Sequence, residues 1–411
     1  MERNEKIGLF GFGCVGQAVY AALEQQAAPG LRVKRIGVRD REKVRSAPAE
    51  RFSYEPGAIL DDPEISLVVE LIDDAEAAFA LVAAALARGK AVVTANKKMV
   101  AHRLPELIRL QRGLGVPLLY EAAVGGSIPI IRTLETMYGR EPLTGLHGIV
   151  NGSSNYILSR LAEPGGEYRQ ALATAQQLGF AEADQRSDVG GFDSKYKLGI
   201  LAAHAFGLNV APDQILNLGI EHLGAADRHF ARQRQSRIKL VARAVRHGAK
   251  QVALFVLPQL VKPGEALFPV DDEWNGISFT GSWGDQQFLQ GRGAGGFPTA
   301  SAVLADIHAV DRGYRYAYAK AEGAQAELAL DGELEVYIGY QERLQLDGIR
   351  WTEVTEDQPA KGYRVGRIAL GHLLELQEEL QHRQLPVIAT GAPVQWAGQH
   401  AHTDHEVLLS A

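Results

Sequence analysis

The chain has 411 residues, 46% of them hydrophobic and 22% charged, so we expect two or three ordinary folded domains. The net charge of −6 without a basic stripe, and the lack of any long apolar run, argue against nucleic-acid and membrane partners. Because Cys14 is the only cysteine and no secretory segment is visible, we expect a cytoplasmic protein without disulfides or a Cys-rich metal site.

The first third of the chain alternates short β-rich runs with longer helical patterns. The predicted strands cover residues 6–10, 32–38, 66–71, 91–94 and 117–120, and helical patterns cover 14–26 and 75–89. This alternation predicts right-handed crossovers and a parallel sheet with helices on both faces. We therefore expect an α/β fold whose N-terminal domain, residues 1–127, is a Rossmann doubly wound parallel sheet.

The rest of the chain follows a different pattern. From about residue 128, longer helices precede strands such as 251–261, which predicts an α+β domain over 128–312. Residues 313–411 are richer in charge and contain strand patterns at 333–340 and 362–370 and one helical pattern at 373–383. They are interpreted as a small appended α+β module.

The first strand pattern leads directly into a glycine-rich turn. Gly11, Gly13 and Gly16 have the G-x-G-x-x-G spacing, in which the glycines allow a tight turn, close approach to a pyrophosphate and close helix–strand packing. The N-terminus of the following helix then faces the anion. The predicted dinucleotide-binding loop consists of Gly11, Phe12, Gly13, Cys14, Val15 and Gly16.

The choice of dinucleotide depends on the end of the second strand. An acid there binds a ribose 2′-hydroxyl, whereas a cation binds a 2′-phosphate. The sequence offers Arg39, Arg41 and Lys43 beside the acid Asp40, which favours NADP over NAD, with Arg39 as the expected phosphate ligand. The alternative interpretation is a solvated charged turn.

Six stretches occurring in order over about the first 310 residues are those of one enzyme family. Besides the glycine loop, they are residues 94–101, 120–134, 148–158, 182–197 and 291–307. Together they resemble homoserine dehydrogenase, an oxidoreductase of the aspartate-derived pathway to threonine, methionine and isoleucine. The resemblance implies interconversion of L-homoserine and L-aspartate 4-semialdehyde with a nicotinamide cofactor, in a homodimer formed through the second domain.

Hydride transfer to an aldehyde leaves an alkoxide, which needs a positioned proton donor. Lys97 follows a strand of the predicted parallel sheet, at the edge where ligands bind. Lys197 lies four residues after Asp193, so the side chains of Asp193 and Lys197 lie on the same face of one helix. The resemblance assigns Lys97, Lys197 and Asp193 to the reacting hydroxyl. The competing interpretation of Asp193 is a helix cap, which we expect to hold in part.

Other roles follow from the resemblance. Glu182 is expected to bind the substrate amino group, with Asp188 adding negative charge, while Gly152 and Ser153 offer backbone and hydroxyl donors. Asn151 is expected to hold that loop. Thr94, Asn96 and Gly293 are expected near the cofactor. Backbone carbonyls of Glu121, Val124 and Gly126 resemble the family's sodium or potassium site.

The chain also departs from the family pattern. Gln185 stands where a proline is usual, which loosens a loop, and Arg292 interrupts a glycine-rich run. The C-terminal module shows one helical pattern where a regulatory ACT domain has two, so threonine feedback is not expected. Two alternative functions are another Rossmann reductase of a small carbonyl amino acid and a catalytically silent nicotinamide sensor.

Overall fold

The first part of the chain folds around a parallel sheet. The computed structural model describes residues 5–25, 30–178, 185–322 and 326–396. All pairings in the first sheet are parallel, and its order is β3-β2-β1-β4-β5-β6. The strands are β1 (Glu5–Phe10), β2 (Leu31–Gly37), β3 (Phe52–Ser53), β4 (Ile65–Glu70), β5 (Ala91–Thr94) and β6 (Leu118–Leu119). This is the predicted Rossmann-like sheet, with β3 as an addition that the sequence pattern did not indicate.

Helices α1 (Cys14–Glu24), α2 (Gly57–Leu60), α3 (Ala75–Ala87) and α4 (Lys97–Leu114) connect these strands. The side chains of β5 are all buried, as expected for a parallel strand covered on both faces. Helix α4 begins where the side chain of Asn96 accepts a hydrogen bond from the amide of Met99, and it ends at Gly115, which has a left-handed backbone. These caps fix Lys97 as the first residue of α4.

The rest of the described chain forms one large mixed sheet. Its main path is β12-β11-β7-β9-β10-β17-β14-β16-β15, and β8 and β13 also pair with β10. The strands before residue 300 are β7 (Leu143–Ile149), β8 (Leu216–Asn217), β9 (Arg237–His247), β10 (Gln251–Val261), β11 (Trp274–Gly281) and β12 (Gln286–Arg292). The helices over the same region are α5 (Ile130–Thr136), α6 (Gly152–Ala162), α7 (Tyr168–Gln177), α8 (Arg186–Val189), α9 (Phe192–Phe206), α10 (Ala225–Gln233) and α11 (Gly296–Asp311).

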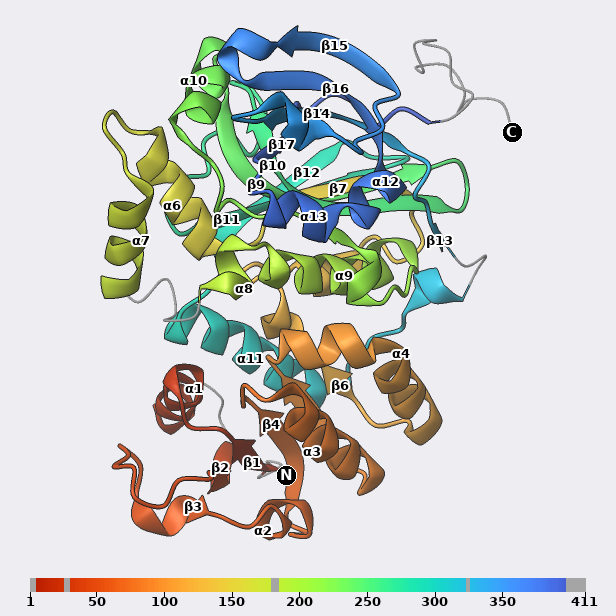
Figure 1. Ribbon diagram of the computed structural model, residues 1–411. Helices are drawn as coiled ribbons and strands as arrows, with labels where there is room; N and C mark the ends of the chain where they lie inside the picture. Colours follow the sequence, from red (N-terminus) through yellow and green to blue (C-terminus); the bar gives the residue numbers. More distant parts are fainter. Residues whose placement is uncertain (1–4, 26–29, 179–184, 323–325, 397–411) are drawn as a thin grey trace.

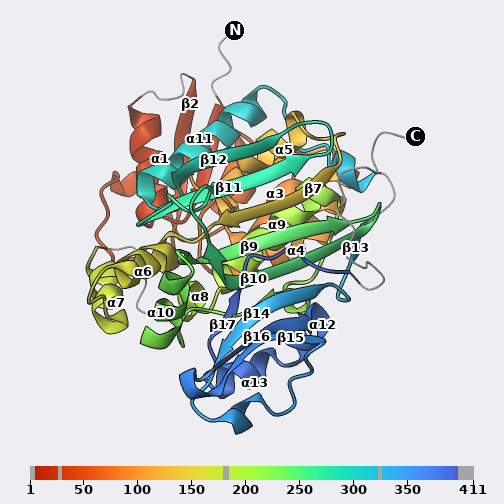
Figure 2. The same cartoon turned by 90° about the horizontal axis from the view of Figure 1, so that it is seen from above.

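Two helices join the two sheets. Helix α9 lies between the large sheet and the first domain, and it packs against both α4 and β9 (Figure 1). Helix α11 returns from the large sheet and packs against α1, as both views show (Figures 1 and 2). The N-termini of α4 and α9 are therefore brought together at the junction between the two parts of the chain.

The C-terminal strands extend the same sheet. They are β13 (Glu327–Leu328), β14 (Glu333–Gly339), β15 (Glu353–Gln358), β16 (Tyr363–Ala369) and β17 (Val387–Ala389). The order β17-β14-β16-β15 is that of a β-α-β-β-α-β module in which the 3-10 turn Arg343–Leu346 replaces the first helix. Helices α12 (Leu370–Glu375) and α13 (Gln377–His382) occupy the segment that was predicted to form one helix. The domain boundaries at 127/128 and 312/313 stay predictions.

None of the described helices combines the length and the apolarity needed to cross a lipid bilayer.

Candidate active site

Three charged side chains meet where α4 and α9 pack together. Nζ of Lys97 lies 2.7 Å from Oδ1 of Asp193, and Nζ of Lys197 lies 2.8 Å from Oδ2 of the same carboxylate. The side chain of Lys97 is 43% exposed, whereas those of Lys197 and Asp193 are buried. Lys197 also donates a hydrogen bond to the carbonyl of Val150 at 2.7 Å. The structure thus brings together the three residues that were predicted to act at one oxygen.

Burial and charge act in opposite directions on this cluster. Burial raises the pKa of Asp193, but the ammonium groups of Lys197 and Lys97 outweigh it and hold that pKa well below its usual range. Burial lowers the pKa of Lys197 from its ordinary value, and the nearby charge of Lys97 lowers it further, against the attraction of Asp193. Asp193 therefore stays ionised, and Lys197 gives up its proton more readily than a solvated lysine.

The N-terminus of α6 borders the cluster. The side-chain amide of Asn151 donates to Asp188 at 2.8 Å and to Asp193 at 3.0 Å, while its oxygen accepts from the amide of Ser154 and caps α6. Ser153 is hydrogen-bonded to Asp188, whose pKa is raised by burial and by the charge of Asp193. Gly152 is the first residue of α6, where a Cβ would lie 2.7 Å from the carbonyl oxygen of Glu273.

The helix cap predicted in part for Asp193 is wrong. Gly191, in a left-handed conformation, is the N-cap of α9, and no side chain caps this helix end. Asp193 lies in the first helical turn, where a negative charge still interacts favourably with the helix dipole. Its two oxygens are instead engaged by the lysines and Asn151.

The glycine loop has the geometry of a dinucleotide cradle. Gly11 has φ +94°, and a Cβ there would lie 2.5 Å from the carbonyl oxygen of Leu71. Gly13 is the N-cap of α1. Apart from its chain neighbours, no heavy atom of the described residues lies within 4 Å of the position its Cβ would take, so its backbone borders open space. A Cβ on Gly16 would lie 2.4 Å from the carbonyl oxygen of Gly11. A pyrophosphate fits such a turn at the start of a helix.

The other residues of this loop have different surroundings. The ring of Phe12 is buried in edge-to-face contact with Tyr20 and Phe52. Cys14 is exposed at the start of α1, and Val15 is partly buried. Because its ring is buried, Phe12 can contact a ligand only through its backbone.

A buried carboxyl group lies at the ends of β4 and β5. Glu70 accepts hydrogen bonds from the hydroxyl of Thr94 and the amide of Ile72, both at 2.6 Å, and burial raises its pKa to about 7. Asn96 donates to the carbonyl of Ile72 at 2.9 Å. The hydrogen bonds of Thr94 and Asn96 thus connect the end of β5 to the end of β4. These strand ends lie at the sheet edge where Rossmann folds bind cofactors. Sequence reasoning missed Glu70, although an acid that ends an apolar strand was a visible signal.

The cationic side chains Arg39, Arg41 and Lys43 of the turn after β2 all lie at the surface. Arg39 is exposed, while Arg41 stacks over the ring of Tyr54 at 4.6 Å from its centroid. Oδ1 of Asp40 accepts from the amides of Glu42 and Lys43, which hold the pKa of that carboxyl below its ordinary value. One oxygen of Asp40 is therefore used by the turn itself.

The segment expected to bind a monovalent cation is firmly anchored. Both carboxylate oxygens of Glu121 accept amide hydrogen bonds at the start of α5, each at 2.8 Å, and burial, then the charge of Asp306, raises its pKa to about 8. Gly126 has φ +55°, and a Cβ there would lie within 2.6 Å of carbonyl oxygens at Arg292 and Gly293. The side chain of Glu121 is therefore engaged by these amides, and the cation site stays a prediction that rests on main-chain carbonyl oxygens such as that of Val124.

Some predicted residues are not placed at the cluster. Glu182 lies outside the described residues. Gly293 packs against Asn275, since a Cβ there would overlap the Asn275 amide. The described residues contain no group of three His, Cys, Asp or Glu side chains arranged to hold a metal ion. The contacts of Asn151 and Val150 with the charged cluster were missed, and only the asparagine had a sequence signal, as a helix cap.

Comparison with known proteins identifies the family. Residues 11–121 match the family model of the homoserine dehydrogenase NAD-binding domain, and residues 129–308 match that of homoserine dehydrogenase. The homoserine dehydrogenase of Synechocystis sp. is 40% identical over 312 residues, which are 74% of this chain and 72% of that protein. The enzyme of Helicobacter pylori is 38% identical over 319 residues, 76% of this chain and 75% of that protein.

Solved structures agree with this assignment. A homoserine dehydrogenase from Thiobacillus denitrificans superposes with a TM-score of 0.79 at 30% identity, over 94% of this chain and 98% of that one. A hyperthermophilic archaeal homoserine dehydrogenase in complex with NADPH has a TM-score of 0.65 at 26% identity, over 76% of this chain and 99% of that one. Neither comparison favours the sensor or another reductase. The chain belongs to the homoserine dehydrogenase family and is an oxidoreductase that interconverts L-homoserine and L-aspartate 4-semialdehyde with a nicotinamide cofactor.

Proposed function

We propose that Lys97 and Lys197 accept the proton of the substrate hydroxyl and return it in the reverse reaction, and that Asp193 holds both ammonium groups in place. In homoserine oxidation the hydroxyl proton passes to a lysine amine, and in the reverse direction a lysine ammonium protonates the oxygen of the former aldehyde. The nicotinamide, when bound, accepts or supplies the hydride. The observation that carries the proposal is the engagement of both Asp193 oxygens by lysines from different parts of the chain.

The charge of the cluster supports this assignment. Two ammonium groups lie on the two oxygens of Asp193 next to a helix N-terminus, and the carboxyl of Asp188 lies on the other side of Asn151. Such a site stabilises the negative charge that develops on the substrate oxygen during hydride transfer. Because burial lowers the pKa of Lys197, this residue exchanges its proton more readily than a solvated lysine does.

We assign recognition of the substrate amine to acidic residues. Asp188 contacts Asn151 and Ser153, so it is held beside the charged cluster at the start of α6. Glu182, from the family pattern, would add a second carboxylate, and the backbone of Gly152 and Ser153 would donate to the substrate. Asp188→Asn should raise KM for homoserine by about tenfold or more, since an ammonium–carboxylate hydrogen bond is lost.

NADP is proposed as the preferred cofactor, with NAD as the poorer one. The support is the exposed guanidinium of Arg39 and the use of Asp40 Oδ1 by its own turn. The archaeal relative in complex with NADPH agrees with this choice. The cofactor would rest on the Gly11–Gly16 loop and near Thr94, Asn96 and Gly293. Arg39→Gln should lower kcat/KM for NADP by roughly tenfold and leave kcat/KM for NAD unchanged.

Three further assignments rest on the family pattern. A sodium or potassium ion would be bound by the main-chain carbonyls of Glu121, Val124 and Gly126, and exchange of the salt for a tetraalkylammonium salt should then lower activity. A homodimer through the second domain should appear as twice the chain mass in light scattering. We also place the enzyme in the cytoplasm, in threonine, methionine and isoleucine biosynthesis.

The function is tested by following reduced nicotinamide with homoserine and either cofactor. Purified wild-type protein should turn over homoserine, with the larger kcat/KM for NADP. Folded protein that turns over homoserine with neither cofactor would refute the assignment. A larger kcat/KM for NAD would refute only the cofactor preference.

A further inference from the structure

A cavity lies at the end of α6 that is remote from the charged cluster. It has a volume of about 570 Å³, within the range of small-molecule sites. Its walls come from the C-terminal half of α6, from α10, from the start of β9 and from the loop that precedes β11. Its apolar side chains include Leu158, Leu161, Leu223, Ile238 and Phe268. The cavity therefore offers an apolar interior to a ligand.

Charged groups line this cavity with an excess of arginine. The arginines are Arg160, Arg228, Arg232 and Arg237, and the carboxylates are Glu163, Asp271 and Asp272. Four positive and three negative charges leave a net charge of +1. Guanidinium groups bind carboxylates through paired hydrogen bonds, so the excess suits one carboxylate.

Two of these arginines, Arg232 and Arg160, have donor groups without a partner among the described residues. Arg232 is exposed and has no ion-pair partner among the residues that the structure describes. The guanidinium of Arg228 donates to main-chain carbonyls, including those of Leu161 at 3.2 Å and Gly166 at 2.5 Å. Nε of Arg160 is buried without a partner in the described part of the chain, while its two terminal nitrogens pair with Glu163 and Asp272. A buried donor of this kind is costly unless a ligand or water accepts from it.

Backbone strain is concentrated at the same place. Gln235 has φ +51° and Asp272 has φ +56°, and both line the cavity. Only two other non-glycine residues in the described segments, Tyr318 and Gln384, have positive φ. Such conformations cost free energy and are found at ligand-binding segments.

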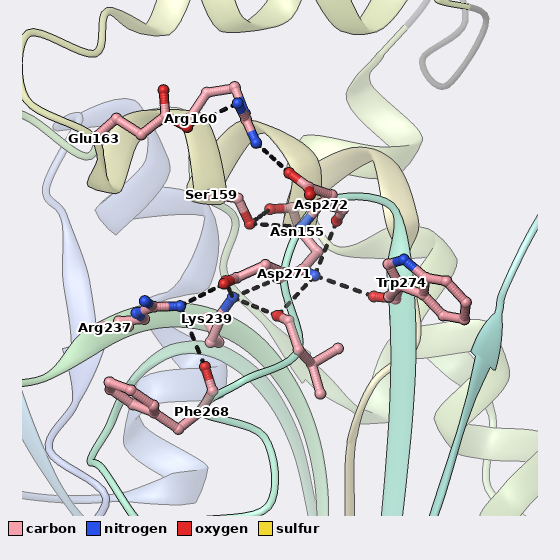
Figure 3. A network of polar contacts seen from close by, with 11 residues as sticks. Asn155, Ser159, Arg160, Glu163, Arg237, Lys239, Phe268, Asp271, Asp272 and Trp274 are labelled. Atoms are coloured by element: carbon pink, nitrogen blue, oxygen red, sulfur yellow. Dashed lines mark hydrogen bonds and ion pairs between the residues drawn. The ribbon is translucent and has the colours of Figure 1, made fainter.

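A hydrogen-bond network connects the cavity wall to α6. The side-chain amide of Asn155 donates to the carbonyls of Val270, Asp272 and Trp274, at 3.0 to 3.1 Å (Figure 3). The amide of Asp272 donates to the hydroxyl of Ser159 at 2.9 Å, and Arg160 pairs with the Asp272 carboxylate. These contacts fix the wall to α6 over two successive turns.

The same helix begins at the active site. Its cap, Asn151, contacts Asp188 and Asp193, and about 10 Å of helix separates Ser153 from Arg160 at 1.5 Å per residue. A ligand carboxylate that pairs with Arg160 in place of Asp272 would break the Arg160–Asp272 ion pair. It would therefore weaken the contacts that hold α6 in its present position. A displacement of α6 would also displace Gly152 and Ser153, which form the start of this helix.

We propose that this cavity is an effector site for a small monocarboxylate with an apolar body, and that its occupation weakens binding of the amino-acid substrate through α6. The carboxylate pairs with Arg232 and Arg160, and the apolar body contacts Leu223 and Phe268. Reciprocity then requires that saturating homoserine weakens binding of the carboxylate by the same factor.

Binding is tested by calorimetry on the whole protein with 4-methylpentanoate, using its neutral isostere 4-methylpentanamide as the comparison. The carboxylate should bind, the amide should not, and Arg232→Gln should weaken binding by about tenfold or more. Arg169→Gln, an exposed arginine on the neighbouring helix α7, is the matched control and should bind as the wild type does. Equal binding of acid and amide, undiminished binding to Arg232→Gln, or no binding at about 10 mM would overturn the site.

Coupling is tested separately by kinetics. Saturating 4-methylpentanoate should raise KM for homoserine by roughly fivefold or more while KM for the dinucleotide stays constant. Ser159→Ala, which removes a network hydroxyl outside the apolar contacts of the ligand, should keep binding but reduce this rise. Binding without any change in KM for homoserine would refute the coupling, whatever the basal turnover of the enzyme.

Discussion

Replacement of Asp193 by asparagine removes the charge that holds the two lysines. Lys197 would keep its hydrogen bond to Val150 but would stay buried beside the ammonium of Lys97 without a counter-charge. Breaking a buried ion pair on one side costs about 3 to 5 kcal/mol. Loss of the counter-charge therefore lowers the pKa of Lys197 further below that of a solvated lysine, because the charged form loses its stabilising partner. In the variant Lys197 should lose its proton at a lower pH than in the wild type.

The variant is assayed in both directions of the reaction and over a range of pH. Reduction of the semialdehyde needs a lysine ammonium as proton donor, so kcat at pH 7 should fall by about 100-fold or more and recover partly as the pH is lowered. The free energy of unfolding should also fall. Asp331→Asn, at an exposed position of the C-terminal region, is the control and should resemble the wild type. The reasoning is refuted if Asp193→Asn retains kcat within threefold of the wild type at pH 7, or if its stability is undiminished.

Two further predictions concern the first domain. Burial raises the pKa of Glu70 to about 7, so the folded state binds more protons than the unfolded state between about pH 4 and pH 7. The free energy of unfolding must therefore fall by about 3 kcal/mol as pH rises through this window. Urea unfolding of Glu70→Gln should lack this loss, and an equal pH dependence in variant and wild type would contradict the assignment. Gly13→Ala has open space for its Cβ, so it should keep the melting temperature of the wild type but raise KM for the dinucleotide at least about tenfold. In Gly11→Ala the new Cβ would meet the Leu71 carbonyl, so this variant should lose both stability and affinity for the dinucleotide. Binding by Gly13→Ala as tight as in the wild type would show that this backbone does not approach the cofactor.

The parts of the fold that the sequence predicted are those set by local patterns. The strands of the first sheet, the turn at Gly11 and the start of α1 follow from apolar runs and glycine spacing over a few residues. The pairing of Asp193 with Lys197 follows from helical periodicity alone. Lys97 could be placed near them because strand ends of a parallel sheet share one edge and because the family pattern named the residue.

What the sequence did not predict depends on tertiary contacts. The carbonyl of Val150 carries no side-chain signature, yet it accepts a hydrogen bond from Lys197 once α6 and α9 are packed. The segment Arg343–Leu346 forms only a short 3-10 turn, which is too brief for a helical period to be recognised. Asp193 was expected to cap α9 in part because a solvated acid before an apolar helix usually does so, whereas this one is buried between two lysines.

The account depends most on Lys97 and Lys197 meeting at one reacting oxygen. The direct test is turnover of homoserine with NADP by Lys97→Ala and Lys197→Ala, compared with Lys98→Ala beside the first and Lys195→Ala on the same helix as the second. Each of the first two variants should fold and lose about 100-fold or more in kcat, while the two neighbouring variants stay within threefold of the wild type. If Lys97→Ala and Lys197→Ala retain the kcat of the wild type, or if all four variants lose it equally, the two lysines do not have the role given to them here.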